Sequence, residues 1–524
     1  MSNQKRIPDL RENKMRTMAP GKLLFNMALP LVLSMLVQAL YNVVDSVYVA
    51  GYSQNAVTAL SLAFPIQNLQ IGCATGAAVG MNSLLSKSLG EGNRERANKA
   101  AGNGIFIMLV LVAMFMLFGF FGASAYYNMQ PISEATAKAG TAYTSICCIY
   151  TLGIFVGIMG ERLLQASGRT IYTMFTQGTG AVLNIILDPL FIYGSEKLGI
   201  PSMGAAGAAV ATVIGQWVGA IMAVIFNLTK NDDVKFALRY IRPDWKILGK
   251  ILGVGIPSMI MMAIGSVMNF GMNQIFLGFE GIGETASGVF GVYFKLQSFF
   301  FMPLFGMNNA AISIIAYNYG ARLPKRITAT LKYSVGAAMV IMLLGLAVFQ
   351  LFPDVLMGIF STSEDATSAD FVTIGISALR IISLMFPMAA VGIALGGASF
   401  QALGNGTYSA IISLCRQLII LLPAAYLLSL TGDVHAVWWS FMIAEVVSLV
   451  LTLLFYAKIY RQKVKPMFAE NELRNRVCQK HARFSFLCVV IIFATRCCGV
   501  TKNTAVFLSK TSVFARCTQT EAVL

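Results

Sequence analysis

Charged residues are scarce in this sequence of 524 residues. Asp, Glu, Lys and Arg make up 12% of it and hydrophobic residues 56%, whereas an ordinary soluble protein is about 25% charged. A soluble chain of this length would also divide into several domains joined by polar linkers, and no such linkers occur. The composition argues against a soluble enzyme, a nucleic-acid-binding protein and a secreted disulfide-rich protein. It predicts an all-α integral membrane protein with many spans.

The residues that many enzymes need are also scarce. The chain has two histidines, His435 and His481, which argues strongly against zinc-dependent hydrolysis and a histidine-based catalytic triad. No Gly-x-x-x-x-Gly-Lys phosphate loop occurs, and the apolar runs leave no room for a soluble nucleotide-binding domain. The nine cysteines lack the spacing of a zinc site or a disulfide framework. We therefore expect no enzyme activity and no organic cofactor, which leaves secondary transport.

The positive charge has a pattern that does not require nucleic acid as a partner. The net charge is +16, but most cations lie in short clusters between apolar runs, as the positive-inside rule predicts. The connections 87–99, 229–250 and 322–332 are basic, whereas the intervening connections 278–285 and 353–370 are acidic. This alternation predicts a multi-pass protein of the plasma (cytoplasmic) membrane with both termini in the cytoplasm.

Twelve apolar runs are long enough to cross a membrane, which requires about 20 residues. An even number of spans also places every basic connection on one side of the membrane. The runs are 23–51, 57–80, 101–123, 141–166, 171–193, 205–228, 247–272, 284–307, 333–352, 371–398, 408–430 and 435–458.

The first six spans are related to the last six by an internal repeat. Residues 28–30 (ALP) match 255–257 (GIP), residues 165–168 (QASG) match 401–404 (QALG), and Pro189 matches Pro423. Transporters use such repeats to build two bundles around a central site. The expected organisation is an N-terminal tail (1–22), a six-helix bundle (23–228), a cytoplasmic connecting loop (229–246), a second six-helix bundle (247–460) and a basic, Cys-rich tail (461–524) to which we assign no function.

Four segments, in this order on two six-span halves, resemble the multidrug and toxic compound extrusion (MATE) family. They are residues 41–51 (YNVVDSVYVAG), 90–93 (GEGN), 184–189 (NIILDP) and 316–321 (AYNYGA). The similarity covers about residues 20–460 and favours the bacterial branch that has its acidic residues in the N-terminal half. The resemblance implies twelve helices in two pseudo-symmetric bundles that form a V-shaped cleft. It also implies cation-driven export of organic, often cationic, compounds, and we expect a monomer that contacts small organic substrates and lipid.

Two aspartates lie inside predicted spans, where burying a charge costs a few kcal/mol. Asp45 lies in the first span, and Asp188 in the fifth, directly before Pro189, whose ring removes a backbone donor. Asn184 is one turn before Asp188 on the same helix face. Two carboxylates and an amide oxygen could hold one proton or a small hard cation such as Na⁺. The alternative is that each aspartate simply hydrogen-bonds a neighbouring helix.

The resemblance assigns Asp45 and Asp188 to the family's cation-coupling site and adds Thr212, which matches a further polar position of that site. The family usually has Asn at a position in the fourth span, where this sequence aligns Gly157 and Ile158. This departure slightly favours H⁺ over Na⁺ as the coupling ion, and both remain open.

Neutral amides in or beside spans 1, 2 and 7, together with a lysine in span 8, are candidates for the substrate cleft. These residues are Gln38, Asn42, Gln67, Asn269, Asn273 and Lys295. Lys295 could compete with a cationic substrate or pair with a carboxylate. Glu161 and Arg162 are adjacent near the end of span 4 and could form an interfacial pair or a cytoplasmic latch, of which the pair, the simpler interpretation, is favoured. Arg416 and Glu445 are lone charges in C-terminal spans, and Glu445 aligns with Gln216 in the repeat.

Two other functions remain as alternatives to a cation-coupled exporter. A flippase for lipid-linked precursors or polysaccharides is one, although such members of the wider superfamily usually have additional spans and a more basic cavity. A membrane enzyme or scaffold is the other, and the missing catalytic groups weaken it.

Overall fold

The computed structural model describes residues 13–52, 54–130, 133–195, 199–235, 237–360 and 366–472. The chain separates into two compact units, Met1–Lys465 and Pro466–Leu524, and the elements below belong to the first. The described residues are almost entirely helical, with one isolated β-bridge between Ser195 and Ile200. The predicted all-α fold is confirmed. Residues 1–12 and 473–524, which include most of both predicted tails, lie outside the described residues.

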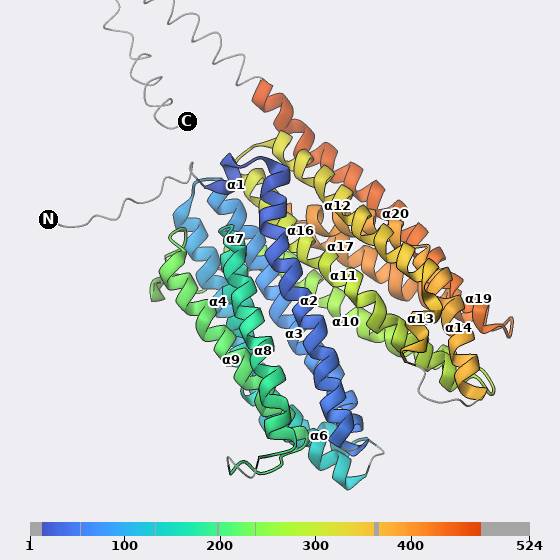
Figure 1. Ribbon diagram of the computed structural model, residues 1–524. Helices are drawn as coiled ribbons and strands as arrows, with labels where there is room; N and C mark the ends of the chain where they lie inside the picture. The colour runs from blue at the N-terminus through green and yellow to red at the C-terminus, as the bar shows by residue number, and fades with distance from the viewer. Residues whose placement is uncertain are drawn as a thin grey trace, which may run out of the picture. The chain divides into compact units, whose positions relative to one another are not determined.

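The helices of the N-terminal half (here the N half, residues 14–230) run from blue into green on the colour scale of Figure 1. They are α1 (Lys14–Thr17), α2 (Pro20–Tyr52), α3 (Gln54–Gly90), α4 (Arg94–Leu117), the π-helix η2 (Phe118–Gly122), α5 (Ala123–Asn128), α6 (Glu134–Ile149), α7 (Leu152–Ala166), α8 (Thr170–Ile192) and α9 (Ala205–Lys230).

A short 3₁₀ turn, η4 (Leu238–Tyr240), lies in the connecting segment before the C-terminal half (the C half, residues 245–464). The C half contains α10 (Trp245–Leu277), α11 (Gly283–Gly320), α12 (Pro324–Leu351), α13 (Pro353–Gly358), α14 (Ala366–Ser383), α15 (Phe386–Val391), η5 (Gly392–Gly397), α16 (Ala398–Ala402), α17 (Gly406–Leu414), η6 (Cys415–Leu421), α18 (Leu422–Ser429), α19 (Val434–Val437), α20 (Trp439–Ile459) and η7 (Tyr460–Val464).

The predicted membrane spans agree with these helices. Nine helices in the described part are long and apolar enough to cross a membrane, and two pairs bent by 45°, α6 with α7 and α14 with α15–α16, bring the number to eleven. Helix α3 has 37 residues and coincides with the predicted run 57–80, but its described part is not apolar enough to be counted with these eleven. It packs extensively against α10, α4 and α11. Each of the twelve predicted runs falls on one of these helices or pairs.

Two helix ends show the internal repeat in their backbone. The segments 165–168 and 401–404 end α7 and α16, and the closing glycines Gly168 and Gly404 have φ angles of 78° and 75°. In both segments the glycine N–H donates to the glutamine carbonyl, and the next N–H donates to the carbonyl five residues earlier. This is the pattern of a glycine-terminated helix, so the matching sequences form the same turn.

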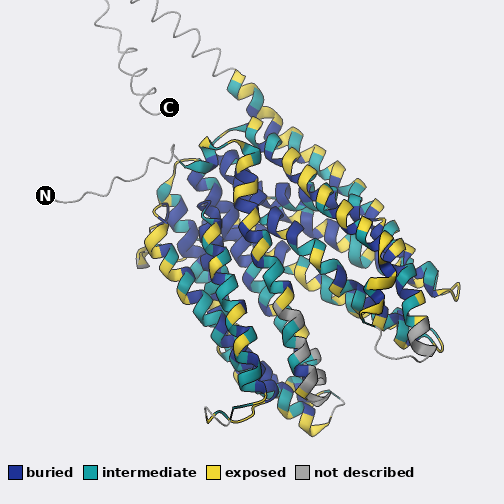
Figure 2. Cartoon of the chain, viewed as in Figure 1, coloured by how far each residue is buried: buried dark blue, intermediate teal, exposed yellow. Residues whose placement is uncertain are grey.

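The two halves contact each other mainly near one end of their helices, the end that carries the basic connections (here the basic end). The opposite end, with 278–285 and 353–370, is the acidic end. Glycines on α3 allow close approach, because a Cβ at Gly80 would collide with the carbonyl of Ile251 on α10. Asn82 donates to Ser313 at 3.1 Å and Ser83 to the carbonyl of Gln401 at 2.7 Å. Buried residues gather toward this end in Figure 2.

The short helix α1 lies against both halves at the basic end. The Met15 side chain is fully buried, and its carbonyl accepts from Arg326 of α12 at 3.1 Å. Asn13, which caps α1, donates to Asp233 in the connecting segment at 3.4 Å. Burial raises the pKa of the Asp233 carboxyl, and the nearby Arg169 opposes this shift. The halves are therefore joined at the basic end by a segment that precedes the first span.

Candidate functional site

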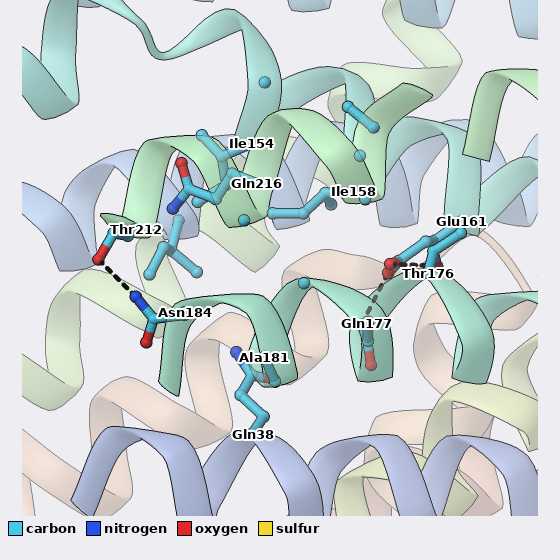
Figure 3. A pocket seen from close by; sticks show the side chains of 17 residues that line it. Gln38, Ile154, Ile158, Glu161, Thr176, Gln177, Ala181, Asn184, Thr212 and Gln216 are labelled. Carbon is cyan, nitrogen blue, oxygen red and sulfur yellow. Dashed lines mark hydrogen bonds between the residues drawn. The ribbon is translucent and has the colours of Figure 1, made fainter. Parts of the chain in front are cut away.

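A cavity of about 160 Å³ lies inside the N half, bordered by α2, α3, α7, α8 and α9 (Figure 3). Small residues at the helix crossings leave this space, because they have little or no side chain to fill it. They are Gly153, Gly157, Gly180, Ala181, Gly215, Gly219 and Ala220. The remaining lining contains polar side chains in two groups, one at each end of the view in Figure 3.

The first group lies at Asn184 and brings together three of the four predicted cation-coupling residues. Asn184 and Thr212 line the cavity, and Asp188, which does not line it, is hydrogen-bonded to Asn184. Asn184 of α8 donates to the carboxylate of Asp188 at 3.2 Å and also reaches the hydroxyl of Thr212 on α9 at 3.3 Å. Asn184 and Asp188 are buried, whereas Thr212 is partly exposed to the cavity. The one-turn spacing of Asn184 and Asp188 places both on one face of α8, toward α9 and α2, which pack against that helix.

Asp45 of α2 joins the same group. Its carboxyl lies within hydrogen-bonding range of the Asp188 carboxyl. Two carboxylates cannot hydrogen-bond to each other unless one carries a proton, and they repel unless a cation lies between them. One oxygen on each of Asp45, Asn184 and Asp188 is buried without a hydrogen-bond partner. These three oxygens from two helices fit a proton or a small hard cation, which binds through oxygen ligands.

Pro189 follows this group directly and lies inside α8, which continues to Ile192. Its ring removes the N–H that would bond the carbonyl one turn earlier. The helix is therefore less tightly held next to Asp188 than elsewhere.

The second polar group of the cavity is centred on Glu161 of α7. Its carboxylate accepts from the Thr176 hydroxyl at 2.9 Å and from the Gln177 amide at 2.7 Å, both on α8. Arg162 does not pair with it and instead donates to Gln165 at 3.0 Å. The interfacial pair or latch expected from the sequence is thus absent between these two described residues. Glu161 is a cavity residue that was not among the predicted site residues, although a carboxylate inside an apolar run is a signal for such a role.

The predicted substrate residues are distributed over both halves. Gln38 lines the cavity, and Gln67 on α3 donates to the Tyr143 hydroxyl at 2.8 Å. Asn269 is half-buried on α10, and Asn273 one turn later accepts from Ser287 at 2.8 Å. Two further predicted residues complete the set. Lys295 is exposed on α11, and Asn42 lies in α2 with its side chain outside the described residues.

A separate ionic pair lies in the C half. Arg416 of η6 donates to Glu445 of α20 at 3.4 Å, and the Glu445 side chain is 3% exposed whereas that of Arg416 is 29% exposed. The other Glu445 oxygen and the buried Tyr293 hydroxyl have no hydrogen-bond partner. Among the described residues no group of three or more His, Cys, Asp or Glu side chains is arranged to hold a metal ion.

These features define a class: a multi-pass helical membrane protein with two repeated halves and a buried acidic site in the first. The chain belongs to the MatE family, whose profile matches residues 30–190 and 257–427, one segment in each half. The resemblance inferred from the four sequence segments is confirmed.

Relatives and solved structures agree with this assignment. The multidrug export protein MepA of Staphylococcus saprophyticus is 23% identical over 426 residues, covering 81% of this chain and 90% of the relative. The probable multidrug resistance protein NorM of Thermotoga maritima is 26% identical over 474 residues, covering 85% and 96%. A crystal structure of MATE in complex with MaL6 superposes with a TM-score of 0.80 at 25% identity, covering 89% of this chain and 99% of that one. An outward-facing multidrug resistance MATE family transporter gives 0.79 at 26% identity, covering 90% and 100%.

Proposed function

We propose that this protein is a secondary active transporter that exports small organic compounds, mainly cationic ones, in exchange for H⁺ or Na⁺. The observation that carries the proposal is the group of unpartnered oxygens on Asp45, Asn184 and Asp188 in the N half. A buried acidic group without a resident cation is stable only with a proton or a mobile cation. Membership of a family whose relatives are named as multidrug exporters supports the same conclusion.

The driving force of such an exchange is sufficient. One charge moving down a potential of about 100 mV supplies about 2.3 kcal/mol, and a tenfold concentration gradient adds about 1.4 kcal/mol. Their sum sustains a ratio of roughly 400-fold for a neutral substrate.

In the proposed cycle, a cation from outside loads Asp45 and Asp188. Loading removes one of the two negative charges, ends the repulsion between the carboxylates and relaxes α8 next to Pro189, which weakens the hold on a cationic substrate and releases it outward. The loaded carrier then turns inward and discharges the cation to the cytoplasm. The two chemistries differ in what they require: a proton needs one carboxylate oxygen, whereas Na⁺ needs several oxygen ligands, for which Asn184 and Thr212 are further candidates.

The orientation that we propose places the basic end and both termini in the cytoplasm, because short basic connections remain inside. The hydrogen bonds of Asn82 and Ser83 across the halves and the anchoring of α1 lie at that end. They support an arrangement that is closed toward the cytoplasm. All cavity residues come from one half of one chain, so a monomer is sufficient for the ion site.

The substrate site proposed here lies between the halves rather than in the N-half cavity. A drug-sized ligand needs a pocket of roughly 300–1,000 Å³, and this cavity measures about 160 Å³. Asn269, Asn273 and Lys295, which do not line that cavity, remain candidates for contacting the substrate, whereas Gln38 lines the cavity.

The test is export by the purified chain in proteoliposomes with an imposed proton or sodium gradient. Asp188→Asn should reduce uphill ethidium export at least 100-fold, because the amide does not take up a proton and lacks the negative charge that would hold Na⁺. Asp354→Asn is the matched control, since Asp354 is an exposed carboxylate in the first turn of α13. Uphill export by Asp188→Asn at the wild-type rate would contradict the proposal.

A further inference from the structure

Glu161 is a buried carboxylate for which the proposed exchange has so far given no role. Its side chain is 8% exposed, and each oxygen accepts one hydrogen bond from a neutral group, Thr176 or Gln177. No ion pair involves it among the described residues, since Arg162 donates to Gln165 instead. Burying a carboxylate without a counterion costs several kcal/mol. Two neutral donors offset part of this cost, and a proton or a cation would remove the rest.

The cavity joins Glu161 to the group at Asn184. Both residues line it, and Figure 3 shows Gln216 and Ile158 between them, with Gln38 on another wall. Gln177 and Asn184 are seven residues apart on α8, which corresponds to about 10 Å along a helix. The volume of about 160 Å³ has room for several water molecules, whereas it is too small for a drug. The cavity can therefore contain water molecules and a small cation.

The two groups lie toward opposite ends of the N half. Asp188 is four residues before the acidic end of α8, at Ile192. Glu161 is five residues before the basic end of α7, at Ala166. A cation that moves from the first group to the second therefore travels from the acidic end toward the basic end.

We infer that Glu161 is a second cation station, which receives the coupling ion from Asp45 and Asp188 through the cavity and passes it on at the basic end. The inference rests on the proposed exchange function. For a proton, the O–H bond breaks at Asp188 and a new O–H bond forms at Glu161, with cavity water carrying the proton. Asp188 becomes a carboxylate and Glu161 a carboxylic acid, so charge and protons balance. For Na⁺, the ion exchanges carboxylate ligands and no covalent bond changes.

Few other charges act on Glu161. Arg162, its neighbour on α7, is the charged group that influences it. The helices packed against α7 are α9, α3, α8, α4 and α11, and Glu161 accepts no hydrogen bond from their ionisable residues. Those residues are Lys230 on α9; Cys73 and Lys87 on α3; Tyr172 and Asp188 on α8; Arg94, Glu95, Arg96 and Lys99 on α4; and Glu284, Tyr293, Lys295, Tyr317 and Tyr319 on α11.

The experiment separates loading of the first group from onward movement of the ion. The full chain is reconstituted in proteoliposomes whose internal and external pH and sodium concentration are set independently. Glu161→Gln should slow gradient-driven ethidium export at least tenfold and abolish its dependence on the cation concentration at the basic end. Ethidium affinity, measured at equal pH on both sides, should stay within about twofold of wild type. The decrease in this affinity when the cation loads Asp45 and Asp188 should also match that of wild type within about twofold. Glu134→Gln is the control, since the Glu134 side chain is 82% exposed.

Two further variants test whether Glu161 binds the cation or only contributes to packing. Glu161→Asp keeps the carboxylate and should retain export within about threefold. Gln177→Ala keeps Glu161 but removes one donor to its carboxylate. This should move the cation profile at the basic end to higher pH if the ion is H⁺, or to lower sodium concentration if it is Na⁺. If Glu161→Gln does not fold, these two variants provide the test, and pH and sodium profiles that are both unchanged in Gln177→Ala would overturn the inference.

The outcomes also distinguish this inference from the proposed function. Wild-type export by Glu161→Gln, with Asp188→Asn inactive, would overturn the station and leave the exchange intact. Wild-type export by both variants would overturn the exchange itself. Equal losses of thermal stability in Glu161→Gln and Glu161→Asp, with an unchanged cation profile, would assign Glu161 to packing and overturn the station.

Discussion

The two halves share a repeat but handle buried charge in opposite ways. The N half buries Asp188 beside Asp45, and no described cationic side chain forms an ion pair with either, whereas the C half buries Glu445 next to Arg416. In the exchange that we propose, the first site takes up a mobile cation, whereas the second already contains its own cation, Arg416. A duplicated fold can therefore carry an exchangeable charge in one copy and a fixed charge in the other.

The sequence offsets show how the halves diverged. At the offset of 227 residues that relates Pro30 to Pro257, Asp45 corresponds to Met272, and at the offset that relates Pro189 to Pro423, Asp188 corresponds to Leu422. The carboxylates of the N half are thus replaced by apolar residues in the C half. At one further position the carboxylate is in the C half instead: Gln216, a neutral residue that lines the N-half cavity, corresponds to Glu445.

The largest expected difference between the halves is in coupling. Asp45→Asn should reduce uphill export at least 100-fold while leaving folded protein in the membrane, because it removes one of the two carboxylates that face each other. Glu445→Gln in the C half should retain coupled export within about fivefold, because Arg416 already neutralises that carboxylate. Efflux from proteoliposomes at matched protein levels measures both. Equal loss in the two variants would show that both halves exchange ions.

The fold could be predicted, and the buried carboxylates could be singled out as candidates, because each has a strong local signal. Apolar runs of span length predict helices, and a carboxylate such as Asp45 or Asp188 inside such a run is costly unless it has a function. The cavity could not be predicted, since it depends on how Gly157, Gly180 and Gly215 meet at helix crossings. For the same reason the sequence indicated an Arg162–Glu161 pair, whereas three-dimensional packing turns the two side chains toward different partners.

A second prediction concerns stability, for which we expect the larger effect in the C half. Arg416→Leu leaves Glu445 buried without a counterion and should destabilise the fold by about 3 kcal/mol. The double variant with Glu445→Gln should recover most of this loss, because it removes the unpaired charge. Thermal unfolding in detergent would measure both, with Asp188→Asn as the N-half comparison, for which we expect no loss of stability because it removes like-charge repulsion with Asp45. An unchanged Tm in Arg416→Leu would contradict the view that the C-half pair is structural.

The smallest expected effect tests whether the hydroxyl of Thr212 belongs to the cation group. Thr212→Val keeps the shape of the side chain but removes the acceptor that Asn184 reaches at 3.3 Å. Such a bond contributes about 1 kcal/mol, which corresponds to roughly a fivefold change in cation affinity.

Thr452→Val in the C half is the matched control, since that hydroxyl bonds only the Ser448 carbonyl of its own helix among the described contacts. The cation concentration that halves ethidium binding should rise about fivefold in the first variant and stay constant in the second. If the ion is a proton, which needs one carboxylate oxygen, the shift should be smaller than for Na⁺, which would lose a neighbouring ligand. Equal shifts in both variants would remove Thr212 from the site and leave Asp45, Asn184 and Asp188 as its members.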